Sequence, residues 1–166
     1  MSNTFTVNTY SPSDVTLIVG GYQISGWQSI SIRRTIKTYA TVRGIRGKHT
    51  RVNSRDSSAS LIVPILMTSQ SNEVLSAIHT EDSIQDTGRL TITLKDKSGK
   101  SVFSSNEAYI TGFPSVVFSG QFEYRAWEIF CQTTDSFSMA GNSRPSTSIF
   151  DGALNEATSF VKGLFN

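Results

Sequence analysis

The 166-residue chain contains a single cysteine, Cys131, so it cannot form an internal disulfide. That composition fits a reducing compartment. No apolar run approaches the roughly 20 residues needed to cross a membrane, and the polar residues 1–14 lack the apolar stretch of a secretory signal. We therefore expect a soluble protein made in the cytoplasm, without a membrane partner. At this length it should form one domain.

Residues typical of catalytic and metal sites are also scarce. The two histidines, His49 and His79, have no acid or cysteine at ligand spacing, which argues against a metal site and indicates exposed side chains. Gly20-Gly21 lacks the lysine and helix that follow a phosphate loop. Glu123 and Glu128 fall on opposite faces of one predicted strand, so they do not form a carboxylate pair. We predict that the protein is not an enzyme and needs no cofactor.

Acidic residues are missing from Val15 to Arg55, although eight of the 15 Lys and Arg residues of the chain fall there. The net charge is only +2, so acids elsewhere offset this stretch. We expect its second half to form a basic loop between two long strands, with contact residues Arg43, Arg46, Lys48, Arg51 and Arg55. Acids cluster later in the chain, and we take Glu81, Asp82 and Asp86 as the acidic counter-surface.

Three interpretations of the basic stretch remain open. Its charges could simply keep an exposed β-edge from aggregating. They could bind nucleic-acid phosphates, but only Tyr39 is present to stack on bases. Alternatively, they could meet the acids of another copy, because opposite patches on one chain favour head-to-tail assembly.

Most of the chain has the alternation of antiparallel strands. Gly20-Gly21 predicts a tight hairpin turn, and Pro64 predicts an edge position or a bulge. Apolar residues on both faces of 122–133 predict cover on both sides, by a core and by a second layer, the helix or a neighbouring subunit. The predicted strands are Val15–Val19, Tyr22–Trp27, Ser29–Ile36 with a possible extension over Thr38–Val42, Ser58–Leu66, Leu90–Leu94, Ser101–Phe103, Ala108–Thr111 and Phe122–Thr133.

Two helices are predicted. The first begins at Ser69 or Ser71 and ends near His79. The second follows a Ser/Gly/Asn/Pro-rich linker and covers Ile149–Phe165, where apolar residues recur at helical spacing. We therefore divide the chain into a β domain, residues 1–137, and an extension, residues 138–166. The apolar stripe of the extension should contact the chain's own domain or a partner, and its main residues are Phe150, Leu154, Phe160, Val161 and Leu164.

In order along the chain, four segments resemble the tail tube proteins of contractile-tailed bacteriophages. They are TYSPSDVTLIVGGYQISGW, a charged hairpin, TSQSNEVLSAIH and AYITGFPSVVFSGQFEYRAWEIFC. The resemblance covers roughly residues 9–135 and lies in the order of the segments, with Ser-Asn-Glu-Val-Leu-Ser-Ala (71–77) after the second long strand. The extension lies outside it.

The resemblance implies a small antiparallel β-sandwich or barrel with one flanking helix, assembled into hexameric rings that stack as a tube around an inner β-barrel. Each subunit would give that barrel four strands, and the basic loop would reach the adjacent ring. Ser29, Ser31, Ser58 and Ser60 suit the inner wall.

The resemblance further implies a virion tail protein assembled in the host cytoplasm. Its partners would be further copies of itself and the sheath, baseplate and terminator proteins, with DNA only as passing cargo. A tail terminator, a secretion-system tube and a basic β-barrel nucleic-acid binder remain alternatives.

Overall fold

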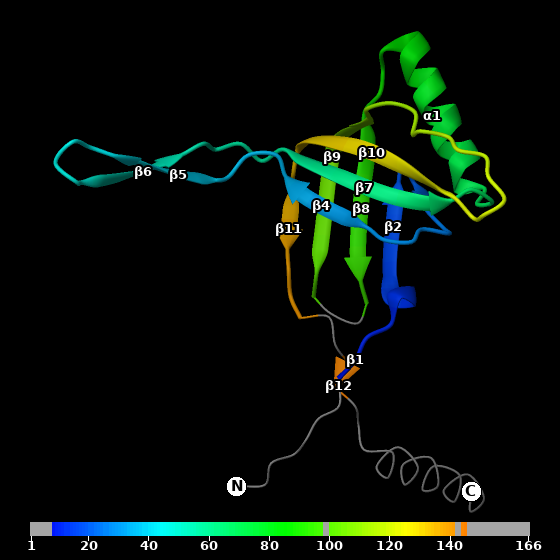
Figure 1. Cartoon of the computed structure of the whole chain (residues 1–166), viewed down its shortest axis with the longest axis horizontal. Helices are drawn as coiled ribbons and strands as arrows, with labels where there is room; N and C mark the ends of the chain where they lie inside the picture. The colour runs from blue at the N-terminus through cyan, green and yellow to red at the C-terminus, as the bar shows by residue number, and fades with distance from the viewer. Residues whose placement is uncertain (1–7, 98–99, 142–143, 146–166) are drawn as a thin grey trace, which may run out of the picture.

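The computed structural model describes residues 8–97, 100–141 and 144–145. The described part is mainly β, as the sequence predicts (Figure 1). Its helices are the 3-10 turn η1 (Pro12–Asp14) and α1 (Ser71–Gln85). Its strands are β1 (Asn8–Thr9), β2 (Val15–Val19), β3 (Tyr22–Gln23), β4 (Ser31–Arg34), β5 (Tyr39–Arg43), β6 (His49–Asn53), β7 (Ala59–Leu66), β8 (Leu90–Asp96), β9 (Val102–Ile110), β10 (Tyr124–Thr133), β11 (Ser136–Ser138) and β12 (Arg144–Pro145).

Eight strands form one antiparallel sheet in the order β3-β2-β8-β9-β10-β7-β4, with β11 paired to β9. Strand β9 pairs with β8 from Val102 to Ala108 and with β10 from Glu107 to Ile110, so the sheet bends at β9. The layer of β10, β7 and β4 thereby crosses over the layer of β2, β8 and β9 (Figure 1). The arrangement is an open sandwich, and the sheet does not close into a barrel within one chain.

The core lies between these two layers. Leu17 and Phe103 contribute from one layer, and Leu61, Trp127 and Ile129 from the other. Each of these side chains is at most 1% exposed. Strict alternation in β7, where Ala59, Leu61, Val63 and Ile65 are buried, matches a strand with one face on a core.

Helix α1 covers one end of the sandwich. Its Leu75 is buried in the core, and the carboxamide of Asn72 accepts a hydrogen bond from the indole Nε1 of Trp127 at 2.9 Å. No side chain caps the helix at Gln70, and it ends at Asp86 in the left-handed conformation. The predicted end near His79 is therefore wrong by about two turns. The last residues of α1 are exposed and do not contact the core, so they carry no apolar pattern that would predict a helix.

Three other predictions need correction. The predicted extension over 38–42 does not continue the preceding strand: residues 39–43 form β5, which pairs with β6 alone among the described strands. Residues 102–110 form one continuous strand, β9, where two were expected. Pro64 lies in β7, which is an interior strand paired with β10 and β4. The pairing with β4 stops at Ile62, and beyond it the Pro64 carbonyl accepts from the backbone N–H of Gln28.

Other predictions are confirmed. Gly20 and Gly21 have φ values of +57° and +86° and turn β2 into β3. The predicted domain boundary between residues 137 and 138 lies within β11 and is not tested, and the helical stripe from Phe150 to Leu164 lies outside the described residues. The division into a β domain and an extension therefore stays a prediction.

Candidate assembly surfaces

The hairpin of β5 and β6 stands away from the sandwich (Figure 1). Every residue of both strands is exposed, and no strand of the body pairs with either of them. Its turn closes through the N–H of Gly44 on the carbonyl of Lys48 at 2.9 Å, and Gly47 takes a φ of +80°. Ile45 at the tip is fully exposed. An isolated two-stranded hairpin is marginally stable in water, so this geometry indicates a partner.

The two faces of the hairpin differ in chemistry. The register pairs Ala40 with Val52 and Val42 with Thr50, which gives one face of small and β-branched side chains. The other face pairs Thr41 with Arg51 and Arg43 with His49. Val42 and Val52 are 57% and 47% exposed. The hairpin thus offers an apolar face and a basic face to whatever it meets.

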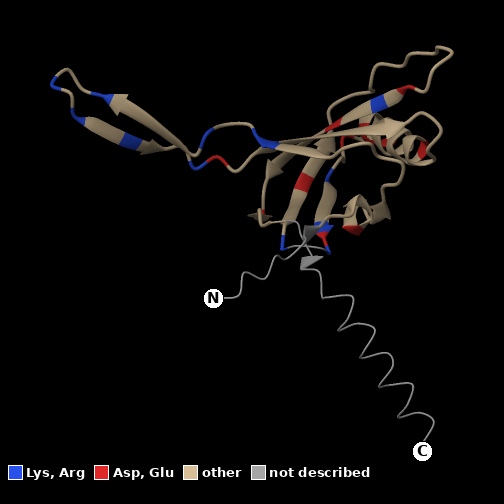
Figure 2. Ribbon diagram, turned by 60° about the horizontal axis from the view of Figure 1, so that its bottom comes forward, with Lys and Arg blue, Asp and Glu red and all other residues tan. Residues whose placement is uncertain are grey.

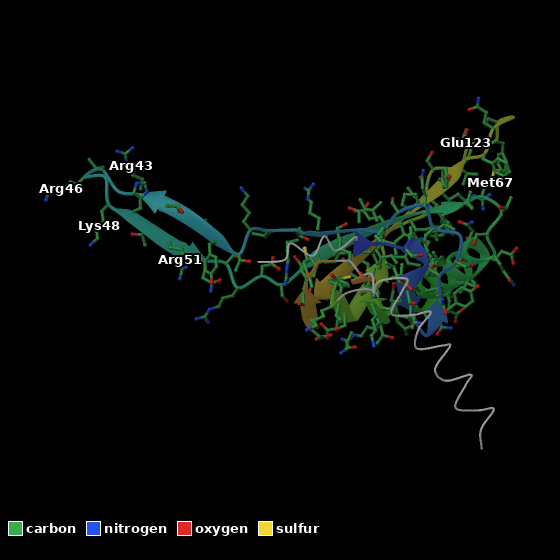
Figure 3. All side chains as sticks on the ribbon, turned by 90° about the horizontal axis from the view of Figure 1, so that it is seen from below. Arg43, Arg46, Lys48, Arg51, Met67 and Glu123 are labelled. Atoms are coloured by element: carbon green, nitrogen blue, oxygen red, sulfur yellow. The ribbon has the colours of Figure 1, made fainter. Side chains whose placement is uncertain are left out.

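The predicted basic residues lie along this hairpin and its base. Figure 3 places Arg43, Arg46 and Lys48 at the tip and Arg51 on β6. The guanidinium of Arg51 lies 4.3 Å from the ring centre of Tyr39. Arg55 lies at the base with a φ of +53°.

One acid sits at the base of the hairpin. The carboxylate of Asp56 accepts from the backbone N–H of Ser58 at 2.7 Å. This hydrogen bond, the Ser58 hydroxyl and the nearby Arg34 guanidinium lower the pKa of Asp56. The acid thus shapes the connection to β7, while the tip keeps an unbalanced positive charge.

The predicted acidic residues lie on the other side of the body (Figure 2). Glu81 and Asp82 belong to the second half of α1, and Asp86 ends it. Glu81 accepts a hydrogen bond from Gln85 of the same helix. The structure therefore does not bring the two charged sets together within one chain, and they could meet only between copies.

A loop that sequence reasoning overlooked adds to the surface near α1. Residues 112–122 connect β9 to β10, and Val116, Val117, Phe118 and Phe122 are between 49% and 80% exposed. The ring of Phe113 packs edge-on against His79 of α1 at 4.7 Å, which corrects the expectation that His79 is exposed. The apolar run Val116-Val117-Phe118 beside Pro114 is the signal that could have identified this loop.

The outer face of β9, β10, β7 and β4 is also uncovered. Trp127, Ile129 and Cys131 of β10 point into the core, but the alternate residues Tyr124, Ala126 and Glu128 are exposed. Among the residues that the structure describes, nothing covers this second face.

Across this face, Glu128 is opposite Ile62 and accepts from the Ser60 hydroxyl at 3.1 Å, and Phe130 contacts Tyr109. Ser29 and Ser31 are exposed, but Ser58 is buried and does not suit a wall.

Catalytic or metal chemistry has little support in the described part of the chain. No group of three or more His, Cys, Asp and Glu side chains there could hold a metal ion. No described helix is long and apolar enough to cross a membrane. Cys131 is buried, and burial raises the pKa of its thiol despite a hydrogen bond with Ser105. A protonated, buried thiol is a poor nucleophile.

Among curated proteins, the structural protein ORF10 of Pseudomonas phage KPP10 is 31% identical over 155 residues. The match covers 87% of this chain and 89% of that protein. This chain belongs to the family of that phage protein. No protein-family profile matches the sequence.

One solved structure is also similar. It is a cryo-EM structure of the sheath/tube terminator of an extracellular contractile injection system in its extended state. The likeness covers 76% of this chain and 94% of that chain, with a TM-score of 0.49 and 16% identity. At so low an identity and TM-score it says nothing about function.

Proposed function

We propose that the chain is a structural protein of a contractile phage tail that assembles as stacked hexameric rings and forms the inner tube, through which DNA is ejected. Its relative in phage KPP10 carries the name of a structural protein, which supports a role in the virion. The observation that carries the proposal is the β5–β6 hairpin, fully exposed and unpaired with the body. Such a hairpin gains stability by contact with another chain.

The distribution of surfaces supports contact between copies. The basic hairpin projects at one side of the body, while the acids of α1 and the apolar loop 112–122 lie at the other (Figures 2 and 3). Complementary patches on different sides of one chain favour head-to-tail assembly. In the tube, residues Arg43, Arg46, Lys48, Arg51 and Arg55 would contact the next ring, near its Glu81, Asp82 and Asp86.

The uncovered outer face of β9, β10, β7 and β4 supports assembly into a ring. Strands β9, β10, β7 and β4 expose one face, and β4 pairs with β7 alone among the described strands. Pairing at such an edge would join the layers of six subunits into one inner barrel. Ser31 and Ser60 on this face suit a wall that DNA passes, because hydroxyl groups bind phosphates less tightly than guanidinium groups do.

Nucleic-acid binding by the hairpin is less well supported. Its one aromatic side chain, Tyr39, already has the Arg51 guanidinium over its ring, and bases need free aromatic faces for stacking. DNA is therefore proposed as passing cargo, and the other partners as the sheath, baseplate and terminator proteins. The protein would act in the virion tail after assembly in the host cytoplasm, without catalysing a reaction or binding a cofactor.

Gold-labelled antibody against the chain, applied to particles of the phage that encodes it, tests the proposal. A tube protein is covered by the sheath, so we expect label on the tail only after the sheath contracts and exposes the tube. Label restricted to one end of the tail would instead favour a terminator. Label on the capsid would contradict a tail function.

A further inference from the structure

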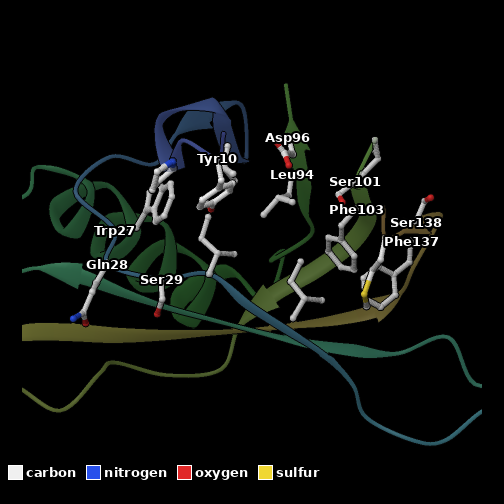
Figure 4. Close-up of a pocket in the computed structure, with 16 residues that line it drawn as sticks. Tyr10, Trp27, Gln28, Ser29, Leu94, Asp96, Ser101, Phe103, Phe137 and Ser138 are labelled. Atoms are coloured by element: carbon white, nitrogen blue, oxygen red, sulfur yellow. The ribbon is translucent and has the colours of Figure 1, made fainter. Parts of the chain in front are cut away.

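In the described part of the chain, one end of the sandwich lacks the cover that α1 gives to the other. An open groove of about 550 Å³ runs along the free edge of β4, between that strand and the layer of β8, β9 and β11. Figure 4 shows Trp27 at one end of the groove and Phe137 at the other, with Leu94 and Phe103 between them. The groove is mostly apolar, and a surface of this kind usually has an occupant.

The walls of the groove are continuous with the core. Ile30, Ile32, Leu94 and Phe137 are partly buried hydrophobic side chains that pack against it. Met139 at the rim is 77% exposed and Tyr10 is 53% exposed. The apolar side chains of these two residues are therefore exposed to solvent in the described part of the chain. A segment bound in the groove would bury them.

The chain beyond residue 145 starts next to this groove. Tyr10, which lines the groove, follows β1 directly, and β1 pairs with β12 through Thr9 and Arg144. Residue 145, the last one that the structure describes, therefore lies near the groove's rim. A linker of four residues precedes Phe150 and spans about 13 to 14 Å when extended.

The sequence of that segment fits an apolar groove. Its predicted helix carries the stripe that includes Phe150, Leu154, Phe160 and Leu164, and a helix of this length is about 26 Å long. We propose that the C-terminal segment docks in the groove of its own chain through this stripe. The segment would thus close the second end of the sandwich as α1 closes the first.

A photo-crosslinker at position 160 tests the docking directly in the full-length protein. With Phe160 replaced by benzoylphenylalanine, irradiation should join residue 160 to peptides that contain Tyr10, Leu94 or Met139. An equal mixture of ¹⁴N and ¹⁵N protein tells which chain supplies the groove. Crosslinks within chains of one isotope support the proposal. Crosslinks between isotopes would place a neighbour's segment there, and crosslinks to other surfaces would exclude the groove, so either result overturns it.

Hydrogen exchange of charge variants gives a second readout. Phe160→Asp with Leu164→Asp should speed amide exchange in β4 and β11 about tenfold, because local opening no longer has to displace the segment. Asn155→Asp with Ser159→Asp adds the same charge on the predicted polar face and should change little. Exchange in β10 reports whether the core stays folded. Equal protection of β4 and β11 in both variants would overturn the docking.

Discussion

Asn72 shows at the scale of a single residue how the helix is fixed to the sheet. Its side chain is 3% exposed and accepts from Trp127 while its amide donates to the carbonyls of Leu66 and Ser69 at 2.8 and 3.0 Å. One side chain thus links the start of α1, the end of β7 and the middle of β10. A buried polar network of this kind is stabilising only while every member is bonded.

Replacement of Asn72 by alanine should therefore be costly. Asn72→Ala removes the acceptor of the buried Trp127 N–H and leaves the Leu66 carbonyl with the Ser69 N–H as its donor, and we expect the free energy of unfolding to fall by about 3 kcal/mol in urea titrations. The matched variant Asn106→Ala removes the same group from an exposed position of β9 and should cost less than about 0.5 kcal/mol. Equal losses in the two variants would show that the network contributes nothing.

Cys131 should be protected from reagents in the folded chain. It is fully buried, and its raised pKa favours the neutral thiol, so a thiol reagent should label the native protein on the order of a thousandfold more slowly than the unfolded one. Because the folded state holds this proton more tightly, its contribution to stability is intact below the thiol's ordinary pKa. That contribution is lost as the pH rises through the raised value.

Paired urea titrations at neutral and alkaline pH check the sign. The native protein should lose more stability at alkaline pH than Cys131→Ala does, since the variant has no thiol to ionise. Rapid labelling of the folded protein, or the same pH dependence in both proteins, would contradict the account of this side chain.

Strands with strict alternation of apolar and polar residues could be predicted from the sequence, but strands with buried polar residues could not. The pattern of β7 was predictable because its alternate residues face a core. The sequence predicts two strands in place of β9, because residues 104–106 are polar. The structure keeps the strand continuous there, since Ser105 is buried and its hydroxyl donates to the carbonyl of Thr133 at 2.6 Å. A satisfied buried hydroxyl cannot be told from a loop residue in the sequence.

At the scale of elements, the β5–β6 hairpin is the feature on which assembly depends. The sequence predicted a basic loop between long strands, but not a separate two-stranded ribbon. Its strand residues face water on both sides in the single chain, so no burial pattern marks where β4 ends and β5 begins. The late end of α1 was missed for a similar reason, since Ile84 in its last turn is 73% exposed.

Charge reversal at the tip should prevent stacking. Arg46→Glu with Lys48→Glu would place acids opposite the acids of the neighbouring α1, and we expect no assembly beyond single rings in sedimentation velocity. Circular dichroism should remain that of the folded chain, because the tip touches nothing in the body. Lys95→Glu with Lys97→Glu changes the net charge equally at the end of β8 and should assemble normally. If the tip variant still forms stacks, the hairpin charges do not contribute to the contact between rings.

The apolar face of the hairpin should matter independently of its charge. Val42→Thr with Val52→Thr keeps β-branched side chains, so the strands persist, but it weakens contact with an apolar surface such as loop 112–122. We expect the protein concentration needed for assembly to rise about tenfold or more. Thr41→Ser on the basic face is the control and should leave it unchanged. An unchanged threshold in the double variant would mean that the hairpin binds by charge alone.

At the scale of the whole molecule, the described part of the open sandwich leaves the outer face of its sheet exposed to solvent. The predicted cover on the second face of β10 is not supplied by the described residues, where only the face with Trp127, Ile129 and Cys131 is buried, so cover by a neighbouring subunit stays a prediction. The mainly β fold and helix α1 could be predicted, since both follow from local patterns. Contacts with other copies could not, because they depend on surfaces that local sequence does not pair.

Negative-stain electron microscopy of the purified full-length protein tests the central claim most directly. The account predicts rings of sixfold symmetry and stacks of them as tubes of uniform bore, wide enough for a DNA duplex. A chain that stays monomeric at every protein concentration and binds DNA with a steep dependence on salt would contradict it.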